Sequence, residues 1–231
     1  MTLQEFNVEF DILYNNITSN SAPPLNEYEK SVFLTQAQLE IVKELYSGRN
    51  QLGLAIEVNE ESRQYLNSLV TTLSELPQLV SNKDFGKYSK YTLSTIFSKK
   101  KYIAILREWI EIKNNEDVYK EIPVVTSTQD SIVSTLRNPF RGISKKRAIK
   151  IEEGGKEYIY YSIPESTTYT FNRTYLKMPT PIILEGITDS SLTIEDQEVD
   201  EYGIECRLPQ SLHRDILMRA VQLAKQTYVG Q

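Results

Sequence analysis

The spacing of apolar residues changes twice along this chain, and that change limits the fold more than any other feature of the sequence. Over residues 3–17 apolar side chains recur every three or four positions, which is the period of an amphipathic helix. Residues 102–112 and 118–126 are instead rich in the β-branched and aromatic side chains that favour strands. The helical period returns over residues 212–223. The sequence therefore predicts an α+β fold in which N-terminal helices and a C-terminal helix flank a central, mainly antiparallel β-sheet.

The length of the chain bounds its domain organisation. A chain of 231 residues can bury one full hydrophobic core or two small ones. Because we find no internal repeat and no low-complexity segment, we expect a single α+β unit over residues 1–231. Its parts are a helical N-terminal part over 1–76, a β-rich central part over 101–205 and a C-terminal helix over 209–228.

The helical part has clear boundaries in the sequence. Asn26 is a good N-cap, Glu29 follows three residues later as in a capping box, and Gly48 is placed to end the helix that they begin. The apolar spacing then predicts a third helix from Asn59 through Leu73.

Turn residues divide the β-rich part into strands. The pair Gly154-Gly155 separates residues 148–153 from 157–163, which predicts a β-hairpin. Residues 169–175 alternate as a further strand, and residues 181–185 (PIILE) have the composition of another.

Charge is distributed unevenly along the chain. The net charge of −5 argues against a protein whose main task is to grip nucleic acid. Residues 83–101 nevertheless hold six lysines and a single acid, whereas residues 185–205 hold eight acids and no basic residue. One alternative is therefore a nucleic-acid-binding protein that uses the basic segments 87–101 and 141–150, the first of which interleaves lysines and tyrosines over residues 87–91. The competing interpretation is a solvated loop and a strand edge protected by lysine.

The residues needed for common enzyme chemistry are nearly absent. The chain has one histidine, His213, and one cysteine, Cys206. Ser211 and Asp215 are close to His213 in sequence, but residues two apart on a helix do not face each other. A zinc site of the usual histidine and cysteine type lacks enough ligands. We therefore expect no enzyme activity, no metal and no cofactor, and we expect His213 to be a helix-surface or interface residue.

The sequence also lacks patterns that direct a chain to a membrane or out of the cell. No apolar run approaches the ~20 residues that a membrane-spanning helix needs. The N-terminus shows neither the basic nor the apolar region of a signal peptide, and a single cysteine allows no internal disulfide. We expect a protein that folds in a cytosol and does not enter a membrane.

Four stretches, in order along the chain, carry a resemblance to a known family. They are FDILYNNITSNSAPPLNEYEKSVFLTQAQLEIVKELY near the start, NPFRG in the middle, and YLKMPTPIIL and LPQSLHRDILMRAVQLAK toward the end. In these stretches the chain resembles virion proteins of the crAss-like tailed bacteriophages. Residues 83–125 carry little of the resemblance.

The resemblance implies a structural role and not an enzymatic one. It implies a ring protein of the head-to-tail connector, located beneath the portal as part of the tail barrel, with no cofactor. It further implies a homo-oligomeric ring, a dodecamer, whose partners are the portal protein and other tail or ring proteins. Packaged DNA would pass through the channel without sequence-specific binding. Such a protein is located in the virion after synthesis in the cytoplasm of the bacterial host.

Within this interpretation the pentapeptide NPFRG, residues 138–142, is a candidate contact. Pro139 disfavours helix at the residue before it, so a short helix over residues 128–137 should stop at Asn138. Phe140 and Arg141 would then form an anchor that either packs the loop on its own sheet or inserts into a neighbouring subunit.

The uneven charges supply a second candidate contact. Neighbours in a ring meet through two different surfaces, and these must be complementary. We therefore expect an acidic surface to meet a basic one between subunits. The residues assigned to these surfaces are Lys87, Lys90, Lys99, Lys100 and Lys101 on the basic side and Asp189, Glu195, Asp196, Glu198, Asp200 and Glu201 on the acidic side. The competing interpretation is that both segments are solvated loops that never meet.

Overall fold

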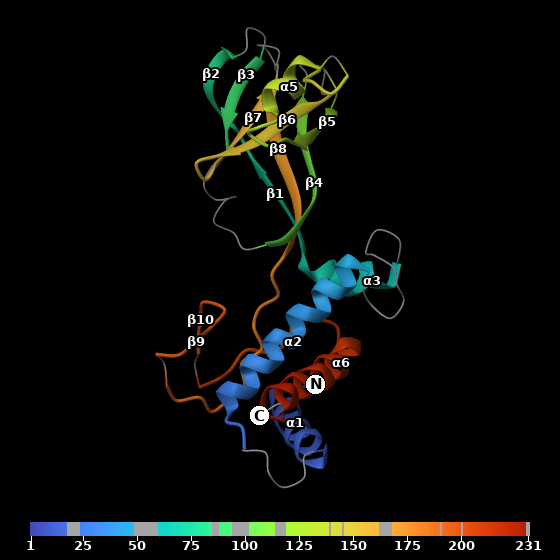
Figure 1. Ribbon diagram of the computed structural model, residues 1–231, viewed down its shortest axis with the longest axis vertical. Helices are drawn as coiled ribbons and strands as arrows, with labels where there is room; N and C mark the ends of the chain where they lie inside the picture. The colour runs from blue at the N-terminus through green and yellow to red at the C-terminus, as the bar shows by residue number, and fades with distance from the viewer. Residues whose placement is uncertain are drawn as a thin grey trace. The chain divides into compact units, whose positions relative to one another are not determined.

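The computed structural model describes most of the chain, which divides into two compact units. The described residues are 1–17, 24–48, 60–84, 88–93, 102–113, 119–138, 140–144, 146–161, 168–189, 191–199 and 201–229. One unit, the helical unit, comprises Met1–Leu69 and Met178–Gln231, and the other, the β unit, comprises Val70–Lys177 (Figure 1). The predicted α+β class is confirmed. The prediction that the chain acts as one unit is not decided by this division and stays a prediction.

Three long helices form the helical unit. They are α1 (Leu3–Ile17), α2 (Glu27–Ser47) and α6 (Gln210–Val229), and each packs against the other two. The shorter α3 (Glu60–Leu66) continues into a 3₁₀ turn, Asn67–Leu69. The helices predicted at both ends of the chain are therefore present.

Helix α2 begins and ends at the residues that the sequence indicates. The Asn26 side chain accepts a hydrogen bond from the Glu29 N–H at 2.8 Å, and the Glu29 carboxylate accepts one from the Asn26 N–H at 2.9 Å. This capping box satisfies two N–H groups that a helix start leaves unpaired. Gly48 ends the helix with φ 74°, in the left-handed region that glycine adopts at low cost.

A buried charge joins α1 to α2. The Lys30 side chain on α2 is almost fully buried, and its Nζ donates hydrogen bonds to Asn7 Oδ1 and to Asp11 Oδ2 on α1, both at 2.8 Å. A buried ammonium is tolerated when it is paired in this way. The contact fixes how these two helices pack.

Residues 181–185, predicted as a strand, are extended but do not join a sheet. The Ile182 N–H donates to Thr35 Oγ1 at 3.1 Å, and the Leu184 N–H donates to Ser31 Oγ at 2.9 Å. Ile183 forms only an isolated bridge with Ile204. Hydroxyl groups on α2 therefore satisfy the backbone groups that a neighbouring strand would otherwise satisfy, so the strand prediction was wrong.

The third helix was predicted too long. It ends with the turn at Leu69, and the chain continues as strand β1 (Val70–Glu75), which pairs with β8 (Thr168–Lys177). The β-branched run Val70-Thr71-Thr72 favours a strand over a helix.

Eight strands form the sheet of the β unit in the order β1-β8-β4-β5-β6-β7-β3-β2. The remaining strands are β2 (Gln78–Asp84), β3 (Tyr88–Thr92), β4 (Tyr102–Lys113), β5 (Tyr119–Thr126), β6 (Ala148–Glu153) and β7 (Lys156–Tyr161). All pairs are antiparallel except β5 with β6, so the mainly antiparallel sheet is confirmed. Strands β1 to β3 were not anticipated.

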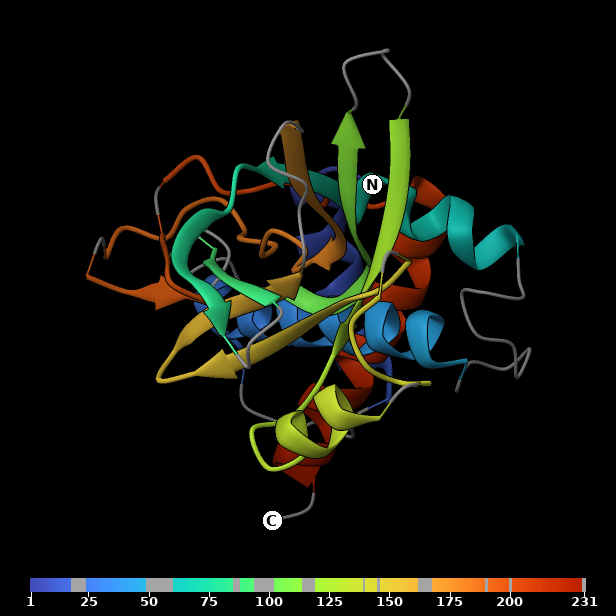
Figure 2. The same cartoon turned by 90° about the horizontal axis from the view of Figure 1, so that it is seen from above.

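The sheet curls into an open barrel. Its two terminal strands, β1 and β2, follow each other in the chain with only Leu76 and Pro77 between them, so the two ends of the sheet meet. Strand β5 turns the opposite corner, because its residues 119–123 pair with β4 and its residues 124–126 pair with β6. Figure 2 shows the β4–β5 hairpin as two light-green strands.

The predicted hairpin of β6 and β7 is confirmed. Its turn is Gly154-Gly155, with φ 59° and 73°. Two consecutive positive φ angles define the turn that matches the twist of a hairpin, and glycine adopts them without strain.

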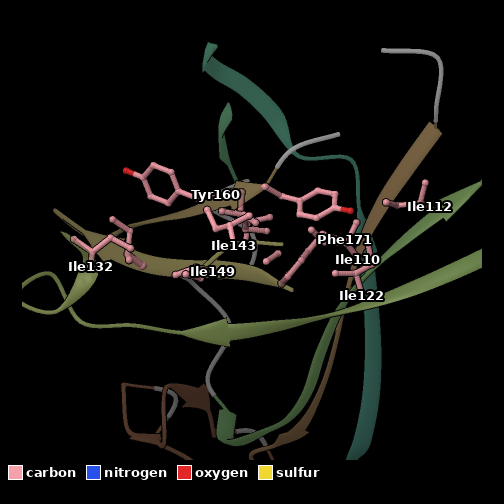
Figure 3. Packing of buried hydrophobic residues seen from close by; sticks show 13 residues of the cluster. Ile110, Ile112, Ile122, Ile132, Ile143, Ile149, Tyr160 and Phe171 are labelled. Carbon is pink, nitrogen blue, oxygen red and sulfur yellow. The ribbon is translucent and has the colours of Figure 1, made fainter. Parts of the chain in front are cut away.

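The inside of the barrel is apolar over much of its length. Ile110 lies directly opposite Ile122 on one neighbouring strand and Phe171 on the other, and all three are fully buried (Figure 3). These residues therefore share one face of the curled sheet, its inner face.

A second apolar layer covers the outer face of the sheet. Ile149 and Tyr160 are cross-strand neighbours on that face and are buried. Ile132 of α5 (Ile132–Arg137) and Ile143 belong to the same cluster and lie beside them in Figure 3. The segment 132–143 is thus fixed to the barrel at both of its ends.

Candidate assembly surface

The NPFRG loop is held by hydrogen bonds from Asn138. Helix α5 ends at Arg137 with Asn138 as its C-cap, as predicted. The Asn138 side-chain oxygen accepts hydrogen bonds from the N–H groups of Phe140 at 2.9 Å and Arg141 at 3.2 Å. Its carbonyl accepts one from the Gly142 N–H at 2.7 Å, and the Arg147 guanidinium donates to the Phe140 carbonyl at 3.2 Å. The backbone on both sides of Phe140 is therefore fixed.

Gly142 is required by the same turn. A Cβ at this position would lie 2.8 Å from the Asn138 carbonyl oxygen and 3.1 Å from the Leu136 carbonyl oxygen. Both atoms belong to backbone that helix α5 holds in place, so only glycine fits without a shift of the chain.

The Phe140 side chain points into solvent. It is 88% exposed, more than any other large apolar residue in the described part of the chain. Of the two expectations for Phe140, packing on its own sheet was wrong, because Ile143 makes that contact instead. Phe140 borders a shallow depression on the β unit, whose lining residues are Asp130, Val133, Ser134, Arg137, Asn138 and Phe140.

Basic residues lie close to Phe140 in the sequence, on both sides of it. Arg137, Arg141 and Lys146 are exposed, and Arg147 is half-buried where it holds the loop. An aromatic ring with arginines around it is a composition enriched in protein interfaces. We call Phe140 together with these four residues the Phe140 patch.

The acidic segment forms a small hairpin in the helical unit. Its strands β9 (Thr193–Ile194) and β10 (Gln197–Glu198) are joined by Glu195 and Asp196, with φ 49° and 64°. Both turn residues are exposed. Buried Ile194 and Val199 attach the hairpin to the apolar cluster of its own unit.

The predicted acidic contacts lie on and beside this hairpin. Glu198 and Glu201 are exposed, whereas Asp200 lies outside the described residues. Nearby, hydrogen bonds from the Ser191 hydroxyl and the Ser191 N–H lower the pKa of the Asp189 carboxyl. The partners proposed for these acids, Lys99–Lys101, also lie outside the described residues, so their pairing stays a prediction.

Of the basic residues near Lys99, Lys90 is bound within its own unit. Its Nζ lies 3.2 Å from the Glu153 carboxylate and 4.0 Å from the centre of the Tyr158 ring. Burial lowers the pKa of Lys90, but the Glu153 hydrogen bond and the contact with Tyr160 outweigh burial and leave that pKa raised. This lysine therefore makes a poor contact for nucleic acid.

The single histidine and the single cysteine do not form a reactive pair of the usual kind. His213 is buried, so its predicted place on the helix surface was wrong. Its Nε2 lies 2.9 Å from the Leu208 carbonyl oxygen and its Nδ1 lies 2.8 Å from the Met1 amino nitrogen, so both ring nitrogens are engaged. Burial raises the pKa of the Cys206 thiol, which disfavours the nucleophilic thiolate.

The residues that the structure describes contain neither a metal-binding cluster nor a membrane-spanning helix. No group of three or more histidine, cysteine, aspartate or glutamate side chains there is arranged to hold a metal ion. In the same residues, no helix has the length and apolar character of a membrane span.

A cluster of four charged side chains inside the barrel was not anticipated. Arg173 is 1% exposed and Lys150 is 3% exposed, and both lie with Glu108 and Glu157. The Arg173 Nε donates to Glu108 at 2.7 Å, and its Nη2 donates to both oxygens of Glu157 at 2.7 Å. The Lys150 Nζ lies 2.6 Å from Glu108 and 3.3 Å from Glu157. Two cations and two anions therefore neutralise each other.

This charged cluster has two consequences for the predicted sites. Burial alone would lower the pKa of Arg173, but the hydrogen bonds that its guanidinium donates to Glu157 and Glu108, together with the negative charges of both carboxylates, keep that pKa raised. Lys150, which belonged to the candidate nucleic-acid segment 141–150, is unavailable to an external ligand because it is buried. The sequence held a clue, since Arg173 alternates with Phe171 and Tyr175 on the buried face of β8.

The chain itself belongs to a known class of phage proteins. The model of the phage tail ring protein 3/4 family matches residues 1–231 of the chain, which therefore belongs to that family. The family is one of structural virion proteins.

Curated relatives narrow the assignment further. Ring protein 3 of Bacteroides phage crAss001 is 33% identical over 235 residues, which cover 97% of this chain and 95% of that protein. Ring protein 4/5 of the same phage is 32% identical over 237 residues, which cover 100% of this chain and 94% of that protein. The resemblance stated from the sequence is confirmed, and the chain is a ring protein of the crAss-like phages.

Proposed function

We propose that this chain forms a ring in the head-to-tail connector, beneath the portal and as part of the tail barrel. The family match over the whole chain supports a ring protein, and both relatives are named as ring proteins. In this proposal the ring is homo-oligomeric and dodecameric, and it contacts the portal protein and other tail or ring proteins. Packaged DNA passes through its channel without sequence-specific contacts, and the subunits are made in the host cytoplasm.

The observation that carries this proposal is the exposed ring of Phe140 on a backbone that is held in place. An isolated loop gains nothing from holding a phenylalanine in water, because the apolar ring would be more stable when buried. Here four hydrogen bonds and a required glycine hold the backbone beside that ring. A rigid aromatic anchor loses little conformational entropy when it enters a pocket on a partner. Phe140 and Arg141 therefore act as assembly contacts.

Charge sets the orientation of neighbours in the same proposal. Glu198 and Glu201 offer an exposed acidic surface on the helical unit, and the Phe140 patch offers a basic one on the β unit. By sequence alone, the proposal also assigns Lys99, Lys100 and Lys101 to the basic side and Asp200 to the acidic side. Complementary charges fix register and partner choice more than they add affinity.

The role is structural and not enzymatic. Both ring nitrogens of His213 are engaged, and the Cys206 thiol is buried with a raised pKa, so neither is poised for nucleophilic or acid–base chemistry. The nucleic-acid alternative is weaker because Lys150 is buried and Lys90 is bound to Glu153. A DNA titration over a range of salt concentrations tests that alternative, since phosphate contacts give a steep salt dependence.

The test replaces the anchor and compares assembly with stability. Phe140→Ala should change the free energy of unfolding by less than about 0.5 kcal/mol, because the side chain is exposed. It should abolish incorporation into particles, measured in phage that carry the variant. Ile12→Ala, at an exposed apolar position on α1, is the matched control and should incorporate normally. Normal incorporation of Phe140→Ala, or a large loss of stability, would refute the anchor.

A further inference from the structure

Three strands of the β unit extend beyond the rest of the barrel as a narrow ribbon. The ribbon consists of β1, the C-terminal half of β8 and the N-terminal half of β4, with β8 in the middle (Figure 1). Both outer strands run antiparallel to β8, so β1 and β4 point in the same direction. The ribbon therefore has two edges that face opposite ways.

Both edges of the ribbon have backbone groups without a strand partner. Among the described residues, β1 pairs with β8 alone. Strand β4 pairs with β5 only over Trp109–Lys113, so residues 102–108 have no described strand on that side. Unpaired N–H and C=O groups on an edge are a template for a strand from another chain.

Exposed apolar side chains accompany both edges. Leu76, the residue directly after β1, is 69% exposed, and Leu79 and Val80 are exposed on β2, the next strand. On β4, Tyr102 and Leu106 are exposed. Natural proteins usually protect an edge with charge or bulges, and β4 carries bulges in its register near Ile103 and Leu106. The bulges disfavour unspecific pairing, and the apolar side chains favour a matched partner.

We propose that successive copies of this chain pair the β4 edge of one subunit with the β1 edge of the next. The proposal rests on the ring function above. A cyclic ring needs a heterologous interface, in which two different surfaces on opposite sides of each subunit meet. The ribbon supplies such a pair of surfaces on one rigid element. Because neighbours in a ring keep nearly the same orientation and β1 points the same way as β4, the strands between copies pair in parallel.

The register of the ribbon identifies which residues meet. Thr72 and Arg107 both lie opposite Thr174, so they are level with each other on the two edges. Both are exposed and share the same face of the sheet. In a ring whose axis follows the strands, Thr72 of one copy adjoins Arg107 of the next. If neighbouring copies are offset by two residues along the strands, Ser74 of one copy adjoins Arg107 of the next instead. Ser74 is also exposed on that face.

Disulfide trapping tests this arrangement. Two double variants are made in a Cys206→Ser background. The first combines Thr72→Cys with Arg107→Cys and tests the level register. The second combines Ser74→Cys with Arg107→Cys and tests the register offset by two residues. Within one chain β8 separates the two positions by about 10 Å, two strand spacings, beyond the ~7 Å that a disulfide spans. Oxidation is applied to ring-sized fractions, or to virions if the chain assembles only there. Unchanged melting temperatures confirm that the variants fold.

Each result of the cross-linking experiment either supports or overturns the pairing of β4 with β1 between subunits. We expect a ladder of covalent oligomers from at least one double variant, and no cross-link in any of the three single-cysteine variants. Rings that form but give no ladder with either pair overturn the edge pairing and leave the ring function standing. A dimer from Thr72→Cys alone means that two β1 edges meet symmetrically, which also overturns the proposal. If no rings form in solution or in virions, the ring function itself fails.

Discussion

The inside of the barrel and the Phe140 patch both invert the usual rule for which side chains are buried. The barrel buries four charged side chains, Glu108, Lys150, Glu157 and Arg173, and the patch exposes a phenylalanine. The buried charges have every opposite charge that they need within the same unit. Among the residues that the structure describes, no apolar side chain covers the ring of Phe140.

The charged cluster and the Phe140 patch therefore differ in role: the first stabilises the subunit, and the second is available for contacts with other subunits. A buried charge without a partner would cost several kcal/mol, so the cluster must be complete in the folded subunit. An exposed aromatic ring costs the folded subunit little, so its partner can come from another subunit. A buried charged residue thus indicates a structural role when its partners lie in the same chain. An exposed aromatic residue without such partners indicates a contact with another subunit.

The largest expected effect comes from breaking the charged cluster. Arg173→Ala leaves Glu108 and Glu157 buried with only Lys150 as a partner. We expect the free energy of unfolding to fall by about 3–5 kcal/mol, measured by urea denaturation. Lys156→Ala, at an exposed position on the neighbouring β7, is the control and should change it by less than about 0.5 kcal/mol.

A fourfold variant sharpens this result. Replacing all four charged residues with methionine removes every buried charge at once, and such replacements are often neutral or stabilising. If the fourfold variant is less stable than Arg173→Ala, the cluster itself stabilises the barrel, and our account of the single variant is wrong.

The next largest effect is expected for the buried Phe171, whose replacement should lower stability far more than that of the exposed Phe140. Phe171→Ala removes a fully buried ring from the barrel and should lower the free energy of unfolding by about 3–5 kcal/mol. Phe140→Ala should change it by less than about 0.5 kcal/mol. The same denaturation measurement on both variants checks the contrast. Similar losses for both would show that Phe140 is buried in its own subunit.

The smallest effect is expected at Gly142. Gly142→Ala places a Cβ 2.8 Å from the Asn138 carbonyl oxygen, so the turn must shift, at a cost of about 1–3 kcal/mol. Because the shift moves Phe140, incorporation into particles should fall more than the loss of stability explains. Gly155→Ala is the control, since nothing lies within 4 Å of its added Cβ, although its positive φ also adds some strain. Equal incorporation of the two variants would argue against a rigid anchor.

Much of the fold follows from local rules in the sequence. The capping residues Asn26 and Glu29 and the turn Gly154-Gly155 act within a few positions, so they were predicted correctly. The end of α5 at Asn138 follows from the proline after it. These features depend on backbone chemistry that neighbours along the chain decide.

The errors occur where a distant partner decides the structure. Val70–Glu75 becomes a strand because β8, about 100 residues later, pairs with it. Residues 181–185 stay outside any sheet because hydroxyls of Ser31 and Thr35 bind their N–H groups. Glu108 and Lys150 are each unremarkable in their own segments, and only the closed barrel brings them together. The exposure of Phe140 likewise depended on Ile143 taking the place against the sheet.

The order of the two units in the sequence has a consequence for biosynthesis. The β unit is one contiguous segment, Val70–Lys177, so all its strands can pair as soon as that segment leaves the ribosome. Helices α1 and α2 are made earlier, yet α6, against which both pack, is the last element of the chain. At the usual rate of synthesis they wait roughly ten to thirty seconds for it. Throughout that interval the apolar faces of α1 and α2 lack their final partner, so the nascent chain at this stage is what a host chaperone would bind.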